Sequence, residues 1–165
     1  MSGRPHRLPA FPYIGSQRYF LTFCACNRRT VFTTDVIVTT MLAQISQSSI
    51  RHAFAVLAYC FMPDHLHLLL AATSDSACLI PFAHDAKQRT GFRYRQMTGE
   101  ALWQKGYYEH VVRDDEKTLT IARYIWANPV RAGIVREPRE YAFAGSLVYG
   151  REEMEQAWAS DELRL

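Results

Sequence analysis

The chain has 165 residues, of which 48% are apolar and 21% are charged, and its formal net charge is +3. This composition predicts one globular domain with a sizeable core, and it excludes an intrinsically disordered protein. No stretch approaches the roughly 20 apolar residues that span a bilayer, and prolines interrupt the N-terminus, so we expect a cytoplasmic protein with no membrane partner.

Four strands and three helices are predicted between a flexible basic arm at 1–15 and an acidic C-terminal tail at 151–165. Prolines and Gly15 prevent regular structure in the arm. Period-two and helical spacing of apolar residues gives the elements between them. They are a strand at 17–26, a helix at 33–48, strands at 53–61 and from His65 onward, a helix at 76–98, a strand at 107–112 and a helix at 115–128.

This order predicts an α+β fold, a ferredoxin-like sandwich in a single domain at 16–150. We expect an antiparallel sheet of about four to five strands with helices packed on one face. A tyrosine-bearing helix, described below, would lie near the other face.

His65 and His67 are the most informative residues of the chain. On a strand they point to one face, because side chains alternate, while Leu66, Leu68 and Leu70 form an apolar opposite face suited to core packing. Imidazoles about 6–7 Å apart along one strand can chelate a divalent metal. The alternative is a hydrogen-bonded histidine pair beside a polar surface.

Tyr124 and Asn128 lie four residues apart and therefore share one face of the last predicted helix. The buried stripe of that helix would consist of Leu119, Ala122, Ile125 and Trp126. Pro129 is expected to bias Asn128 away from helical geometry, and Gly133 suits the turn that follows. The alternative is an ordinary amphipathic helix with a C-terminal stop.

Basic residues cluster in two places. The first 34 residues contain five arginines and no acid, and a second cluster between residues 87 and 95 is interleaved with aromatic residues. Basic groups beside aromatic rings suit single-stranded nucleic acid, although a solvated helix surface is the alternative for the second cluster. The candidate DNA-binding residues are Arg4, Arg7, Arg18, Arg28, Arg29, Lys87, Arg89, Arg93 and Arg131.

Cys24 and Cys26 allow a different interpretation. If they shared a strand face beside the histidine strand, a Cys₂His₂ zinc site would be possible. Small buried or half-buried strand residues are the favoured interpretation, because free cysteine is usually found there.

Two motifs together resemble those of the single-tyrosine HUH transposases. The run Met62-Pro63-Asp64-His65-Leu66-His67 is similar to the family's Pro-[Asp/Glu]-His-x-His signature. The run Tyr124-Ile125-Trp126-Ala127-Asn128-Pro129 resembles the tyrosine helix of the REP-associated branch. The resemblance covers roughly residues 17–149, and Tyr141 stands where tryptophan is common in the family.

The resemblance implies a single-stranded DNA transposase that cleaves and rejoins DNA beside hairpins, such as repetitive extragenic palindromes, through a 5′-phosphotyrosine intermediate. Tyr124 would be the nucleophile, and His65, His67 and Asn128 would bind Mg²⁺ or Mn²⁺. Relatives exist as monomers and as homodimers. The alternatives are a non-cleaving hairpin-binding relative and an unrelated small metallohydrolase that uses the His-x-His motif.

Overall fold

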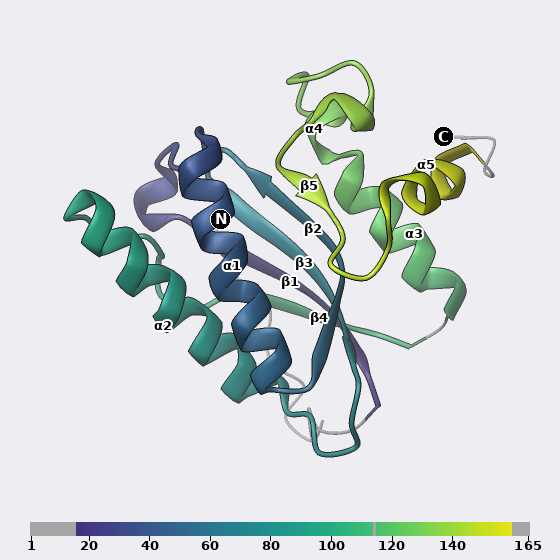
Figure 1. The fold of residues 1–165 in the computed structure, drawn as a ribbon, viewed down its shortest axis with the longest axis horizontal. Coiled ribbons are helices and arrows are strands. Elements are labelled where there is room, and N and C mark those ends of the chain that lie inside the picture. The colour runs from purple at the N-terminus through teal and green to yellow at the C-terminus, as the bar shows by residue number, and fades with distance from the viewer. Residues whose placement is uncertain (1–15, 114, 160–165) are drawn as a thin grey trace.

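The computed structural model describes residues 16–113 and 115–159, so the predicted arm at 1–15 lies outside the described residues (Figure 1). The described part contains a five-stranded antiparallel sheet with strand order β4-β1-β3-β2-β5. Its strands are β1 (Arg18–Cys24), β2 (Phe54–Met62), β3 (His65–Ala72), β4 (Tyr108–Val112) and β5 (Ala144–Gly145). The α+β prediction is confirmed, and the first four strands take the predicted βαββαβ order with its helices.

Helices lie on both sides of this sheet (Figure 1). They are α1 (Asp35–Arg51), α2 (Leu79–Thr98), α3 (Asp115–Trp126), α4 (Asn128–Arg131) and α5 (Arg151–Ala159). Short 3₁₀ turns occur at η1 (Cys26–Arg28) and η2 (Pro138–Glu140). Helices α1 and α2 cover one face, while α3 and α5 lie beside the other.

The larger core lies between the sheet and helices α1 and α2. Leu66, Leu68 and Leu70 are fully buried there, as predicted, opposite Met41 of α1 and Phe82 of α2. The histidines of β3 therefore face away from α1 and α2, because neighbouring strand residues point to opposite sides.

A smaller core joins the second face of the sheet to α3. Ala122, Ile125 and Trp126 pack against sheet residues such as Leu69, as the predicted stripe requires. Leu119 was also predicted to be buried, and that prediction is wrong, because its side chain is 41% exposed. Its place on the wall of an open cavity of about 590 Å³, which helix α5 also lines, accounts for the exposure.

The end of the tyrosine helix differs from the prediction. Helix α3 ends at Trp126, and Asn128 begins the short helix α4 instead of adopting a non-helical conformation. Pro129 is tolerated there because the first turn of a helix needs no N–H donor from it. Gly133 has a φ of 71° and closes the predicted turn, with its N–H donating to the carbonyl of Val130.

Residues 151–159 of the predicted acidic tail form helix α5. Met154 is buried against the second core, and the Arg123 Nε donates to the Ala157 carbonyl at 2.8 Å. Glu152 and Glu153 in the first turn are favourable to the helix dipole. In the described part of the chain, no helix is both long and apolar enough to cross a membrane.

Candidate active site

The two histidines turn their rings towards each other on the side of β3 that faces away from α1 and α2. The Nε2 atoms of His65 and His67 lie 3.1 Å apart. Each Nδ1 atom is held by a neighbour, since His65 donates to the Asp64 carboxylate at 2.6 Å and His67 lies 2.8 Å from the Thr22 hydroxyl. When the Thr22 hydroxyl accepts from His67, the lone pairs of both Nε2 atoms face one region, and such outer contacts orient imidazoles that chelate a metal.

Burial fixes the charge state of His67. Burial, together with the neighbouring His65, Arg131 and Arg28, lowers the pKa of His67 to about 3. The imidazole is therefore neutral at ordinary pH, which is the form that can bind a metal ion.

Tyr124 reaches the same face of the sheet from helix α3. The ring of Phe20 joins it to the histidines, with its centroid 6.2 Å from that of Tyr124 and 5.3 Å from that of His67. The Tyr124 side chain is 49% exposed, so its hydroxyl-bearing ring is open to a large substrate. An accessible phenol thus lies one aromatic ring away from two convergent imidazoles.

Arg131 holds the Tyr124 residue from the following turn. Its guanidinium carbon lies 3.9 Å from the centroid of the Tyr124 ring, and its Nη2 donates to the Tyr124 carbonyl at 2.8 Å. This stacked cation places positive charge beside the phenol and restricts the ring.

Trp126 anchors the helix that bears Tyr124. Its buried indole Nε1 donates to the carbonyl of Gly145 in β5 at 2.9 Å. Because Tyr124 is two residues away on a helix of 3.6 residues per turn, burial of Trp126 directs Tyr124 out of the core. The indole therefore fixes the direction of the phenol without touching it.

The side-chain amide of Asn128 contains a buried polar atom without a hydrogen-bond partner in the described part of the chain. Its Nδ2 atom is buried and has no hydrogen-bond partner among the described residues. Helix α4, which begins at this residue, contacts β2, the strand beside the histidine strand. The unpartnered atom is a hydrogen-bond donor, so the group that satisfies it is an acceptor, and the amide has to turn over before it offers its oxygen to a cation.

The donor set fits a divalent cation of the Mg²⁺ or Mn²⁺ type. Within the described residues, no three His, Cys, Asp or Glu side chains gather to hold a metal ion. The two imidazoles are two of the three metal ligands expected from the sequence, and the third would be the amide oxygen of Asn128. Mixed imidazole and oxygen ligation matches Mn²⁺ well and Mg²⁺ less well.

The cysteine alternative is wrong. Cys24 ends β1, but the chain then turns at Ala25, and Cys26 lies in η1 instead of on the strand. The Cys24 Sγ accepts a hydrogen bond from Arg28 at 2.9 Å. The two thiols therefore do not share the strand face that a Cys₂His₂ site requires.

Three of the predicted DNA-binding cations lie on the histidine side of the sheet. Arg28 pairs with Asp64 at 2.9 Å, and both Arg28 and Arg131 act electrostatically on His67. Arg18 lies on the same face at the other end of β1, where it lines the cavity beside α3. Arg4 and Arg7 fall outside the described residues.

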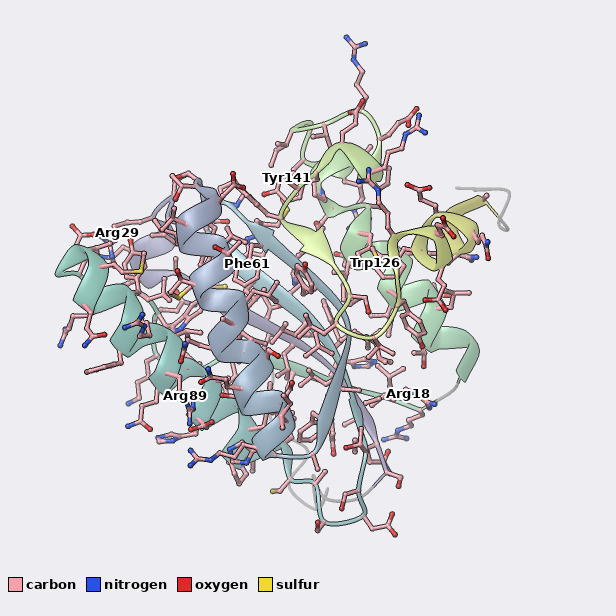
Figure 2. The ribbon with its side chains drawn as sticks, viewed as in Figure 1. Arg18, Arg29, Phe61, Arg89, Trp126 and Tyr141 are labelled. Carbon is pink, nitrogen blue, oxygen red and sulfur yellow. The ribbon has the colours of Figure 1, made fainter. Side chains whose placement is uncertain are left out.

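The other four are bound elsewhere. Arg89 pairs with Asp85 at 3.0 Å between α1 and α2, and Arg29 pairs with Glu100. Arg93 donates to Gln96 on the same helix. Figure 2 shows Arg29 and Arg89 on the α1/α2 side, away from Trp126. The structure does not bring these residues to the histidine pair.

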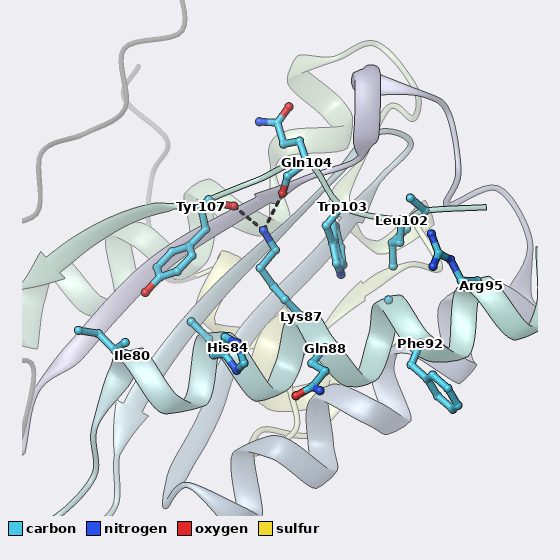
Figure 3. A pocket seen from close by; sticks show the side chains of 14 residues that line it. Ile80, His84, Lys87, Gln88, Phe92, Arg95, Leu102, Trp103, Gln104 and Tyr107 are labelled. Atoms are coloured by element: carbon cyan, nitrogen blue, oxygen red, sulfur yellow. Dashed lines mark hydrogen bonds between the residues drawn. The ribbon is translucent and has the colours of Figure 1, made fainter. Parts of the chain in front are cut away.

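Lys87 lies at the wall of a cavity of about 550 Å³ between α2 and residues 101–107. Its ammonium donates to the carbonyls of Gln104 and Gly106, as Figure 3 shows. Burial lowers the Lys87 pKa to about 8. This cation therefore holds the loop before β4 in place on the side of α2.

Sequence reasoning missed Thr22 and Phe20. Period-two alternation places both on one face of β1, but their meeting with His67 depends on the register of β1 against β3. Only that register shows that Thr22 lies opposite His67.

Known proteins share this architecture. The family model described as IS200-like transposase matches residues 14–128. A candidate REP-associated tyrosine transposase of Haemophilus influenzae is 28% identical over 137 residues, which cover 76% of this chain and 77% of that protein. The solved structure of a REP-associated tyrosine transposase bound to a REP hairpin has a TM-score of 0.69 at 20% identity, covering 87% of this chain and 82% of that one. A candidate transposase from Deinococcus radiodurans has a TM-score of 0.51 at 21% identity, covering 74% of this chain and 95% of that one.

Proposed function

Because the chain belongs to the IS200-like transposase family, we propose that it cleaves and rejoins single-stranded DNA beside a hairpin, with Tyr124 as the nucleophile. One observation carries the proposal: Tyr124 and His67 contact the same Phe20 ring, and the Nε2 of His67 converges with that of His65. The arrangement puts an exposed phenol and a pair of imidazoles on one face of the sheet.

The reaction is a transfer of a phosphodiester. The Tyr124 hydroxyl oxygen forms a bond to phosphorus, the bond from phosphorus to the 3′-oxygen breaks, and that oxygen takes a proton as the phenol loses its own. The product is a 5′-phosphotyrosine link and a free 3′-hydroxyl. Covalent catalysis of this kind conserves the phosphodiester for rejoining.

The residues around the phenol have distinct roles. Phe20 and Arg131 hold the Tyr124 ring, and the Arg131 guanidinium supplies positive charge near an incoming phosphate. Asp64 and Thr22 orient the two imidazoles.

His65, His67 and Asn128 would bind Mg²⁺ or Mn²⁺. Such an ion, when bound, supplies a Lewis acid that neutralises charge on the phosphate. The convergence of the two Nε2 atoms and the neutral state of His67 support this assignment.

The proposed partner is hairpin DNA with a single-stranded flank. The similar structure bound to a REP hairpin supports this choice. An unrelated metallohydrolase would need a further acid or histidine at the pair, and the described residues offer no such cluster.

The test is covalent capture from a pool of labelled hairpin oligonucleotides with randomised single-stranded flanks. We expect wild-type protein with Mn²⁺ to give a band of protein linked to DNA on a denaturing gel, and Tyr124→Phe to give none while still binding the pool. Tyr149→Phe is the matched control at another exposed tyrosine. Binding without any adduct from wild-type protein would instead identify the non-cleaving alternative.

A further inference from the structure

A second exposed tyrosine lies at the edge of the candidate active site. Tyr108 is on β4, which ends the strand order of the described sheet, and its Cα pairs with that of Thr22. Thr22 in turn pairs with His67. Because directly paired residues in antiparallel strands point to the same face, Tyr108, Thr22 and His67 form one row across the histidine face.

Phe20 lies at the centre of this aromatic group. Its ring meets Tyr108 at a centroid distance of 6.1 Å and an interplanar angle of 69°, and meets Tyr124 at 6.2 Å and 86°. Both contacts are edge-to-face. Phe20 therefore forms a floor, and the rings of Tyr108 and Tyr124 stand at steep angles to it.

Core packing does not account for the Tyr108 side chain. It is 42% exposed, although it packs one edge on Phe20. Its alternating neighbours Glu109 and Val111 are buried. The sheet thus leaves a large aromatic ring open to solvent beside the residues proposed to cleave DNA.

We propose that Tyr108 is a stacking site for an unpaired nucleobase next to the phosphate that Tyr124 attacks. Two strand spacings separate Tyr108 from His67, about 10 Å along the row, which is within reach of a nucleotide adjoining that phosphate. The base has to be unpaired, because the face of a base inside a duplex is covered by its neighbours. Stacking on an aromatic ring tolerates any base, so this site would recognise single-strandedness instead of sequence.

This inference rests on the proposed function, and its test separates the two. Hairpin oligonucleotides that the wild-type protein binds from the same pool are remade with one abasic nucleotide at each flank position in turn. Their affinities are measured by fluorescence anisotropy in a Tyr124→Phe background, so that no cleavage occurs. We expect one abasic position to weaken binding by between about 5-fold and about 150-fold.

The inference predicts that Tyr108→Ala weakens binding by a similar factor and makes the same abasic position neutral, because the stacking partner is already lost. Tyr108→Phe should restore both affinity and abasic sensitivity, since it keeps the ring. Tyr149→Ala, at a tyrosine that is also 42% exposed, should leave both unchanged. Circular dichroism confirms that each variant is folded.

Tyr108→Ala could still lose affinity at the same abasic position as the protein that keeps Tyr108. If wild-type protein also formed the covalent adduct, that result would refute the stacking site and leave the proposed function standing. If wild-type protein formed no adduct, the proposed function would be refuted. The abasic scan measures affinity and needs no cleavage, so it would still decide the role of Tyr108. A loss of affinity without any change in the abasic profile would assign Tyr108 to support of Phe20 alone.

Discussion

Asn128 combines a stability cost with a proposed ligand role. A buried amide nitrogen without a partner costs about 1–3 kcal/mol, and an apolar residue of similar shape avoids that cost. Asn128→Leu should therefore unfold at an equal or higher temperature than wild-type protein in the presence of a chelator. The same variant should lose the rise in melting temperature that Mn²⁺ gives to wild-type protein, because a ligand stabilises only the state that binds it.

Asn128→Asp is the matched control for this prediction, since its carboxylate offers an oxygen in the same place and should preserve the Mn²⁺ effect. A full Mn²⁺ shift in Asn128→Leu would remove Asn128 from the ligand set.

His67 predicts how stability depends on pH. Burial lowers the pKa of His67 from 6.5 to about 3, so between these values the unfolded chain binds a proton that the folded chain does not. Stability should therefore fall as the pH drops from 6.5 towards 3, by at most about 1.4 kcal/mol per pH unit from this residue.

Urea unfolding at pH 7 and pH 4.5 measures this effect. His67→Gln should show a smaller loss over that interval than wild-type protein, while His84→Gln, at an exposed histidine of α2, should behave as wild type. Equal pH dependence in His67→Gln and wild-type protein would contradict the buried neutral state.

The proposed nucleophile and metal ligands were more predictable than the residues that orient them. Alternation on one strand was enough to pair His65 with His67, and helical spacing was enough to pair Tyr124 with Asn128. Thr22 and Phe20 belong to a different strand, and their contacts depend on a register that no local pattern encodes.

At the scale of elements, Gly145 determines whether β5 can hold the tyrosine helix. A Cβ atom added there would lie 2.8 Å from the Tyr59 hydroxyl oxygen, and the Gly145 carbonyl accepts the hydrogen bond from Trp126. Gly145→Ala should reduce the free energy of unfolding by about 1–3 kcal/mol, because either strand β5 or the Tyr59 ring has to shift. It should also slow adduct formation, because it disturbs the anchor of α3.

Denaturant unfolding and the rate of adduct formation measure the two effects. Gly150→Ala is the control, since a Cβ atom there would meet its nearest neighbour at an ordinary 3.6 Å. Unchanged stability in Gly145→Ala would show that β5 adapts without cost.

Long periodic elements were predicted within a few residues, whereas short ones were not. Strand β5 has two residues, Ala144 and Gly145, and no alternation can be read in so short a segment. The break between α3 and α4 also escaped prediction, because Pro129 can begin a helical turn as readily as it can prevent one.

At the scale of the whole molecule, the sheet separates two groups of cations. Arg131 lies with Tyr124, whereas Arg93 lies on α2, which covers the other face. We expect protein to bind a hairpin with a single-stranded flank more tightly than a fully paired duplex of the same sequence. Arg131→Gln should lower the slope of log affinity against log salt by about 0.7, the value for one phosphate contact on a single strand.

Fluorescence anisotropy at several salt concentrations measures both quantities. Arg93→Gln should change the slope less, and an equal change at both positions would mean that the DNA also reaches α2. The sequence showed where basic residues cluster along the chain, but it could not show which of them lie on the histidine side of the sheet, because the face that α2 covers is set by packing.

The position of the Phe20 ring predicts whether two inactive variants can restore each other's activity when they are mixed. The ring touches Tyr124 and His67 within one chain, so under the proposed function each copy of the protein would contain both halves of its own reaction centre. A mixture of Tyr124→Phe and His67→Gln proteins should therefore be as inactive in adduct formation as either variant alone. Recovery of activity on mixing would show that the tyrosine helix of one copy serves the histidines of another.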